Sequence, residues 1–124
     1  MKSLILLIIS AMMFFGNKPG VVDSLFDARI VTSEENGSLK IENIFENKSS
    51  EHVKFMYKFQ CERKGRAGSA KSSQSGVVEA APGEEVSLSR TSLSVSPNDA
   101  YRIELQIYDG NRRVAEDSLV YPAE

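Results

Sequence analysis

Few side chains of this sequence could carry out catalysis or bind a metal. The chain of 124 residues contains one cysteine, Cys61, and one histidine, His52. A single thiol cannot form an internal disulfide or a thiolate zinc site, and one imidazole cannot serve a site that needs two. No Gly-x-Ser-x-Gly, phosphate-loop, His-Glu-x-x-His or calcium-loop pattern occurs in the sequence. We therefore expect no enzyme, no cofactor and no metal site.

The two reactive residue types have simple structural interpretations. Cys61 ends the apolar side of an alternating segment, which predicts a small buried core residue. The alternative is a reactive thiol, which needs a basic and partly exposed environment such as Arg63 and Lys64 could provide. His52 lies beside Glu51, and we expect it to be solvated at the surface.

Charge is distributed unevenly along an otherwise ordinary globular composition, which is 41% hydrophobic and 26% charged with a formal net charge of −2. This length allows one domain. The near-neutral balance gives no general attraction to nucleic acid, so we expect no such partner. Between Lys54 and Lys71, however, six basic residues accompany a single acid, Glu62. From Ser72 to the end there are four basic residues and nine acids.

The basic segment predicts a surface that binds a polar or acidic partner. Lys54 and Lys58 share one side of the alternating segment, with Met56 between them. Further basic residues follow where this segment enters a Gly- and Ser-rich loop (65–76). Several charges on one face speed encounters with a partner, although a face kept soluble by its lysines is the alternative. The side chains of Lys54, Lys58 and Arg63 are expected to point to solvent. The predicted partner-binding residues are Lys54, Met56, Lys58, Arg63, Lys64 and Arg66.

The first residues of the chain have the pattern of a signal peptide. Lys2 is followed by an apolar run over 4–15, which breaks at 16–20. A basic start, an apolar run and then breaking residues are typical of export signals, and a membrane span would need ~20 apolar residues. We expect a signal peptide at 1–20, cleaved between 11 and 20, and a periplasmic domain at 21–124 that is free of the membrane. An uncleaved short anchor is the alternative.

The rest of the chain has the period-2 patterning of β-strands. Apolar and polar residues alternate most clearly over 53–61 and 101–108. Apolar residues at 26–30 and 39–41 indicate two earlier strands, separated by the turn dipeptide Asn36-Gly37.

Two breaks in this alternation predict a β-bulge at 44–45 and a bend or bulge within 86–95. Turn residues at 82–83 and 109–111 precede further strands, the last of them over 113–121. Short strands separated by turns at this spacing predict two packed antiparallel sheets. We therefore expect an all-β fold, an immunoglobulin-like antiparallel β-sandwich of about seven strands.

A tight corner, Ser96-Pro97-Asn98-Asp99-Ala100, delivers Tyr101 to the start of a strand. It is similar to the tyrosine corner of immunoglobulin-like sandwiches, in which the phenol hydrogen-bonds to the corner backbone. The alternative is a tyrosine that is simply packed at a strand start. In either case we expect Pro97, Asp99 and Tyr101 to have a structural role.

The same region carries a family resemblance. Residues 93–99 (LSVSPND) run into the alternating strand 101–108 and then into an Asp109-Gly110 hairpin. This order and spacing resembles the curli-subunit chaperone family, the CsgC/CsgH-like group, and the similarity extends over residues 50–122. Members are small periplasmic immunoglobulin-like sandwiches that keep amyloid-forming curli subunits from polymerising prematurely. The resemblance implies a monomeric, non-catalytic inhibitor that binds curli-type subunits weakly and transiently.

One departure from the family pattern bears on activity. Some members carry a Cys-x-Cys pair at the start of the strand before the loop, where this chain has Glu51 and Val53. One thiol cannot cycle between dithiol and disulfide, so the resemblance implies an inhibitor and not an oxidoreductase. An extracellular adhesive or structural β-sandwich module remains the alternative function, because sandwiches host many functions.

Overall fold

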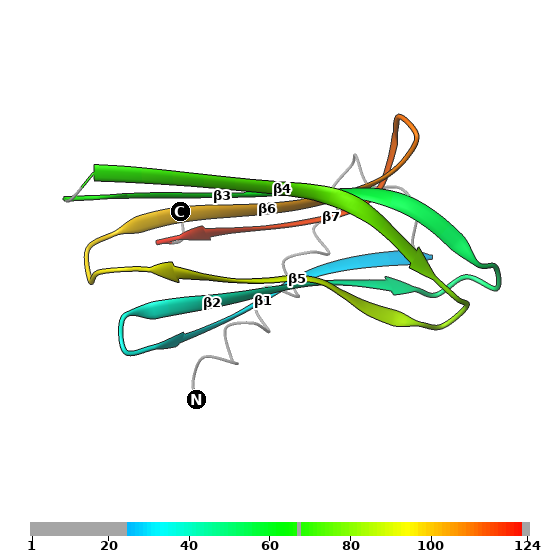
Figure 1. Ribbon diagram of the computed structural model, residues 1–124, viewed down its shortest axis with the longest axis horizontal. Helices are drawn as coiled ribbons and strands as arrows, with labels where there is room; N and C mark the ends of the chain where they lie inside the picture. Colours follow the sequence, from blue (N-terminus) through cyan, green and yellow to red (C-terminus); the bar gives the residue numbers. More distant parts are fainter. Residues whose placement is uncertain (1–24, 67, 123–124) are drawn as a thin grey trace.

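Two antiparallel β-sheets pack face to face in a computed structural model that describes residues 25–66 and 68–122 (Figure 1). The strands, in chain order, are β1 (Phe26–Glu35), β2 (Ser38–Asn47), β3 (Val53–Gly65), β4 (Gly68–Ala80), β5 (Glu85–Ser94), β6 (Ala100–Asp109) and β7 (Arg112–Tyr121). One sheet has the order β1-β2-β5 and the other the order β4-β3-β6-β7. The predicted immunoglobulin-like β-sandwich is confirmed. The predicted signal peptide lies outside the described residues.

Alternation of apolar and polar residues decides which side of each strand is buried. On β6, Ile103, Leu105 and Ile107 are completely buried, whereas the residues between them are partly exposed. Phe59 on β3 and Phe45 on β2 fill the core from the two sheets. Complete burial of one such side chain stabilises the fold by about 1.5–3 kcal/mol. The described residues contain no helix long and apolar enough to cross a membrane.

The turn between β1 and β2 follows from its two residues. Asn36 and Gly37 have φ angles of 51° and 79°. Positive φ at both central residues is what a type I′ hairpin turn requires, and its twist matches that of the flanking strands. The strands therefore pair directly from Glu35 and Ser38 onward, as the sequence predicts.

The irregularity of the three-stranded sheet lies in β5 and not in β2. Between Asn43 and Ile44 of β2, the partner on β5 changes from Ser89 to Ser87, which leaves Leu88 as the extra residue. The bend or bulge predicted within 86–95 is confirmed as a bulge, but the bulge predicted at 44–45 is wrong. The inward side of β2 is continuous, and a polar residue, Asn43, occupies one of its buried positions. That polar residue interrupts the apolar pattern without interrupting the strand.

Residues 68–76, which the sequence predicts to be part of a loop, belong to the long strand β4. It pairs with β3 without a register shift, from Gly65 and Gly68 to Val53 and Ala80. Its first residues, 68–75, are all exposed. Because neither side of this part of the strand is covered, no apolar alternation marks it in the sequence.

Candidate functional site

The core holds the only thiol of the chain. Cys61 is 4% exposed and belongs to the buried cluster between the sheets. Burial raises the pKa of its thiol, and the neighbouring charge of Arg63 only partly opposes this effect. A protonated, buried thiol is a poor nucleophile, so the interpretation of Cys61 as a core residue is confirmed. His52 is exposed, and no cluster of His, Cys, Asp or Glu in residues 25–66 and 68–122 could hold a metal ion.

Replacing Cys61 with alanine should lower the free energy of unfolding by about 1 kcal/mol, because a small buried group is lost. Urea denaturation followed by circular dichroism measures this change. In the parent protein the thiol should react with a charged thiol reagent only after unfolding. Rapid labelling of the native protein would contradict this placement of the thiol.

Three predicted residues lie in a row on the outward side of the four-stranded sheet, which we call the outer face. Lys54, Met56 and Lys58 alternate with inward-facing residues of β3, and all three are exposed. Lys64 lies farther along the same side, with its Nζ 3.9 Å from Oε2 of Glu62. The structure therefore brings together Lys54, Met56, Lys58 and Lys64.

Arg63 does not belong to the outer face. It lies on the inward side of β3, where its Nη1 donates a hydrogen bond to the Ser94 carbonyl oxygen at 2.8 Å. Its Nε lies 4.0 Å from Oδ2 of Asp99. Arg63 thus joins the four-stranded sheet to the end of β5 and to the corner that follows. The prediction that Arg63 points to solvent with the lysines is wrong, because the alternation of β3 continues to the end of the strand.

The β3–β4 hairpin extends the outer face with two more basic residues. Arg66 is exposed in the turn of the hairpin. Lys71 is exposed on β4 and is in register with Glu62 of the outer face. Lys71 is absent from the predicted site because the sequence places it in a loop, where its direction is undefined.

The outer face is locally basic because most of its acids are already paired. Glu62, Glu104 and Glu116 form ion pairs with Lys64, Arg102 and Arg113, at 3.9, 3.5 and 3.4 Å respectively. Lys54, Lys58 and Lys71 form no ion pair with any described residue. The remaining acid of this face is Glu79, in register with Lys54.

An exposed apolar stripe crosses the outer face between these lysines. Met56 is in register with Val77 of β4 on one side and with Tyr108 of β6 on the other. Met56 and Val77 are 50% and 56% exposed. The Nζ of Lys58 lies 5.3 Å from the centroid of the Tyr108 ring, a cation–π contact. Val77 and Tyr108 are further members of the surface that only strand register reveals.

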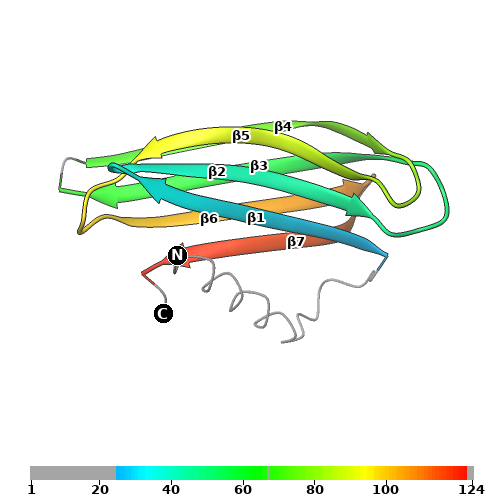
Figure 2. The same cartoon turned by 90° about the horizontal axis from the view of Figure 1, so that it is seen from below.

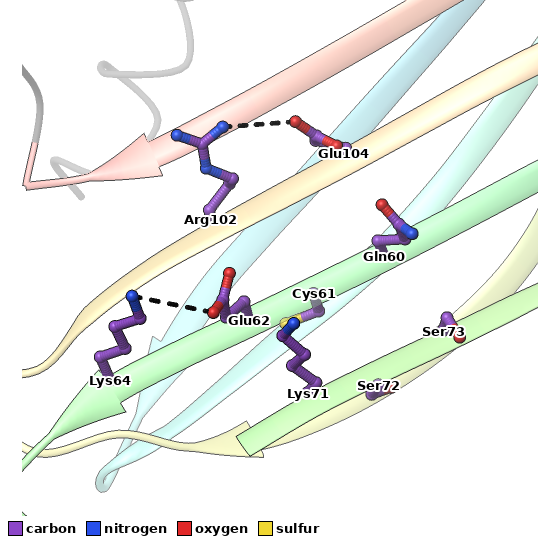
Figure 3. Close-up of a pocket in the computed structure, with 9 residues that line it drawn as sticks. All are labelled: Gln60, Cys61, Glu62, Lys64, Lys71, Ser72, Ser73, Arg102 and Glu104. Atoms are coloured by element: carbon purple, nitrogen blue, oxygen red, sulfur yellow. Dashed lines mark hydrogen bonds and ion pairs between the residues drawn. The ribbon is translucent and has the colours of Figure 1, made fainter. Parts of the chain in front are cut away.

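A hollow lies on the outer face nearer the turn of the β3–β4 hairpin (Figure 3). Figure 3 shows Lys64 and Arg102 joined to Glu62 and Glu104, whereas Lys71 has no such link. Small-molecule sites are mostly apolar and enclosed. The lining of this hollow is polar and open instead. The lining residues on the outer face are Gln60, Glu62, Lys64, Lys71, Ser73, Arg102 and Glu104, and the lining is completed by Cys61 and Ser72, which alternate with them along β3 and β4.

The outward side of the three-stranded sheet has the opposite character. Arg29 is held there by Asp27 at 2.8 Å, by Glu46 at 3.4 Å and also by Glu85. The register of the sheet places an excess of acids on this side. The acids are Asp27, Glu35, Glu42, Glu46 and Glu85, and the basic residues are Arg29, Lys40 and Arg90.

The corner between β5 and β6 is closed by a carboxylate. The backbone N–H of Asp99 donates to the Ser96 carbonyl oxygen at 3.0 Å, and the Ser96 N–H donates to Oδ2 of Asp99 at 2.8 Å. A Cβ at Gly65 would lie 1.9 Å from Oδ1 of Asp99, so this approach requires glycine. Pro97 is exposed in the same corner. Asp99 therefore supports the structural role that the sequence predicts for it.

Tyr101 packs at the start of β6 against the last residue of β7. Its ring stacks on that of Tyr121, with centroids 5.1 Å apart and 17° between the planes. Among the described residues, no hydrogen bond joins the phenol to the corner backbone. The structure agrees with a tyrosine packed at a strand start, and the tyrosine-corner hydrogen bond is not formed.

Replacing Tyr101 with phenylalanine should make the free energy of unfolding fall less steeply at alkaline pH. Burial, with a smaller contribution from Glu34, raises the pKa of Tyr101 from 10.0 to about 12. The native state therefore keeps a proton that the unfolded state loses, so stability present below pH ~10 declines as the pH rises toward ~12. Urea denaturation in steps from neutral pH to pH ~11 compares the two proteins. If the free energy of unfolding falls equally with pH in the parent and the variant, Tyr101 is not the origin of the pH dependence.

Comparisons with known proteins relate this geometry to two solved structures. A scan of protein-family models and a search of curated proteins find no match. The curli protein CsgC of E. coli superimposes with a TM-score of 0.63 at 17% identity, over 79% of this chain and 99% of CsgC. The solution structure of CsgH from R. palustris gives 0.57 at 16% identity, over 74% of this chain and 90% of CsgH. The chain therefore has a CsgC/CsgH-like fold.

Proposed function

We propose that this protein is a periplasmic, non-catalytic inhibitor that keeps amyloid-forming, curli-type subunits from polymerising prematurely. The observation that carries the proposal is the fold it shares, over 79% of its length, with a structure named as a curli protein. The sequence motif at 93–110 resembles the same group, and this resemblance does not depend on the fold comparison. The outer face supplies a physical means of contact with a client.

The outer face combines the two kinds of contact that a partly collapsed polypeptide offers. Met56 and Val77 give it an exposed apolar stripe, which the unpaired Lys54 and Lys58 flank on β3, and the unpaired Lys71 lies farther along β4. Each exposed charge contributes only a few tenths of a kcal/mol. Several such charges together produce an attractive electrostatic potential. Dissolved salt screens this potential, with a Debye length of ~8 Å at physiological ionic strength. Binding is therefore weak, salt-dependent and transient.

Weak binding to the client is sufficient to delay the formation of amyloid fibrils. Fibrils grow by stacking flat strands of low net charge, and the first nuclei are rare compared with monomers. A soluble sandwich that covers the surface of an early oligomer blocks this stacking, so substoichiometric amounts suffice. Cycling between a dithiol and a disulfide takes no part, because the chain has a single cysteine. Cys61→Ala should therefore leave the delay of polymerisation unchanged.

Incubation of a purified curli-type subunit with the mature protein tests the proposal. We expect most of the subunit to stay in the supernatant after centrifugation, at times when the subunit alone has sedimented as fibres. An unrelated globular protein of similar size and net charge is the control. If the protein sediments with the fibres without reducing their amount, it is an adhesive module and the proposal fails.

A further inference from the structure

The four sheet edges of the sandwich are protected to different degrees. Unpaired strand edges are templates for pairing with another chain, and most proteins cover or distort them. β1 and β7 lie side by side (Figure 2), and the Ile30 N–H donates to Oδ2 of Asp117 at 2.9 Å. β5 is distorted by the bulge at Leu88, and Arg63 donates to its Ser94 carbonyl oxygen. β4 has neither a bulge nor a proline.

The free edge of β4 can be assigned residue by residue. Gly65 and Gly68 pair across a two-residue turn. The two residues that flank such a turn each donate a backbone hydrogen bond to the other. Gly68 and every second residue after it therefore direct their N–H and C=O groups toward β3. The residues between them direct these groups away from β3, to the free edge of the sheet. In the described residues no other element hydrogen-bonds to these outward groups. The residues that direct their N–H and C=O groups to this edge are Ser69, Lys71, Ser73, Ser75, Val77 and Glu79.

The side chains around this edge indicate which strand it accepts. Residues 69–75 are small or polar and all exposed, so they favour a polar strand over an apolar one. The hairpin carries Arg66 and Lys71 close to the edge, with Lys64 on the adjacent strand. A second copy of the same edge would bring these positive charges together, which opposes self-pairing. An extended polar segment with carboxylates avoids that repulsion.

We propose that the edge of β4 binds an extended, polar, acidic segment of a client as an added strand. This proposal takes the client to be an incompletely folded chain, and that premise rests on the function proposed above. Main-chain hydrogen bonds supply the affinity and tolerate many sequences, as in other cases of strand addition. Lys71 and Arg66 select segments with carboxylates. The bound segment is then unavailable for stacking on other copies of the client.

The test uses the protein labelled with nitrogen-15 and a blocked synthetic peptide about ten residues long, built from Thr, Gln and Ser with Asp at alternating positions. The amides of Ser69, Lys71, Ser73 and Ser75 should shift and exchange more slowly with solvent when the peptide binds. Ser73→Pro removes one edge N–H without touching a hydrogen bond to β3, and should weaken binding at least about tenfold. The matched control, Ser73→Ala, keeps the N–H and should bind within about twofold of the parent. Ser75→Pro repeats the test if Ser73→Pro does not fold.

Several results would overturn the assignment. One is equal binding by the parent and by a folded proline variant. Another is equal binding of a peptide in which Lys replaces Asp, because the edge would then not select carboxylates. Sedimentation that detects a dimer which Ser73→Pro dissociates would make a second copy the occupant. If the peptide binds as expected but fibre formation is not delayed, the edge assignment stands and the proposed function fails.

Discussion

Replacing Asn47 with alanine is expected to lower the free energy of unfolding by about 3 kcal/mol, because all the hydrogen bonds of a completely buried side chain are lost together. Asn47 is completely buried at the end of β2. Its Nδ2 donates to the carbonyl oxygens of Glu51, Ala80 and Ala81, at 2.7, 3.1 and 3.1 Å. Its Oδ1 accepts from the backbone N–H and the hydroxyl of Ser49, at 3.0 and 2.7 Å. One side chain thus holds the β2–β3 connection against the end of β4.

The other buried asparagine provides the comparison, because it is equally buried but makes fewer hydrogen bonds. Asn43 is also completely buried, but it makes one side-chain hydrogen bond, from Nδ2 to Oγ of Ser89 at 2.9 Å, and its Oδ1 has no partner. Asn43→Leu removes an unsatisfied oxygen and should leave stability within about 1 kcal/mol of the parent. Urea denaturation at neutral pH measures both variants. Equal losses from the two substitutions would show that burial alone, and not hydrogen bonding, sets their importance.

Reversing the charge of Lys54, Lys58 and Lys71 together is expected to weaken client binding by about fivefold to 150-fold. This follows from a loss of a few tenths to one kcal/mol at each exposed site. The lag before polymerisation of a curli-type subunit should then shorten toward that of the subunit alone. The effect should be large at low salt and small at high salt, where the charges are screened. Because the three side chains are exposed, the melting temperature should barely change.

A second triple variant controls for net charge. Lys40→Glu, Lys48→Glu and Arg90→Glu make the same change in charge on residues that are all exposed and lie away from the outer face. This variant should delay polymerisation about as well as the parent. If both triple variants lose the delay equally, the overall charge of the protein matters and the outer face has no special role. If neither loses it, the lysines serve only solubility.

The sequence predicts most of the fold because burial follows from alternation. The strands β3 and β6 each have one side facing the opposite sheet, and their apolar residues mark that side. The same alternation places Lys54, Met56 and Lys58 on one face, since they occupy every second position. Local turn chemistry, as at Asn36-Gly37, adds the register of the first hairpin.

The features that the sequence does not predict depend on contacts between distant parts of the chain. Nothing local distinguishes the exposed strand 68–75 from a loop, because its pairing with β3 decides its conformation. Arg63 faces inward because Ser94 and Asp99 come within its reach only after β5 and the corner have packed. Asn47 resembles a surface residue until its five hydrogen-bond partners are assembled around it. The proposed surface accordingly gains Lys71 and loses Arg63.

The central claim is that this sandwich delays the nucleation of a curli-type amyloid. The most direct measurement is the lag time of a purified subunit, followed by dye fluorescence, with the protein, lacking the predicted signal peptide, added at about one part in fifty. We predict that the lag lengthens several-fold at low salt and that the later growth rate changes little. A lag identical to that of the subunit alone, with the added protein folded by circular dichroism, would contradict the account.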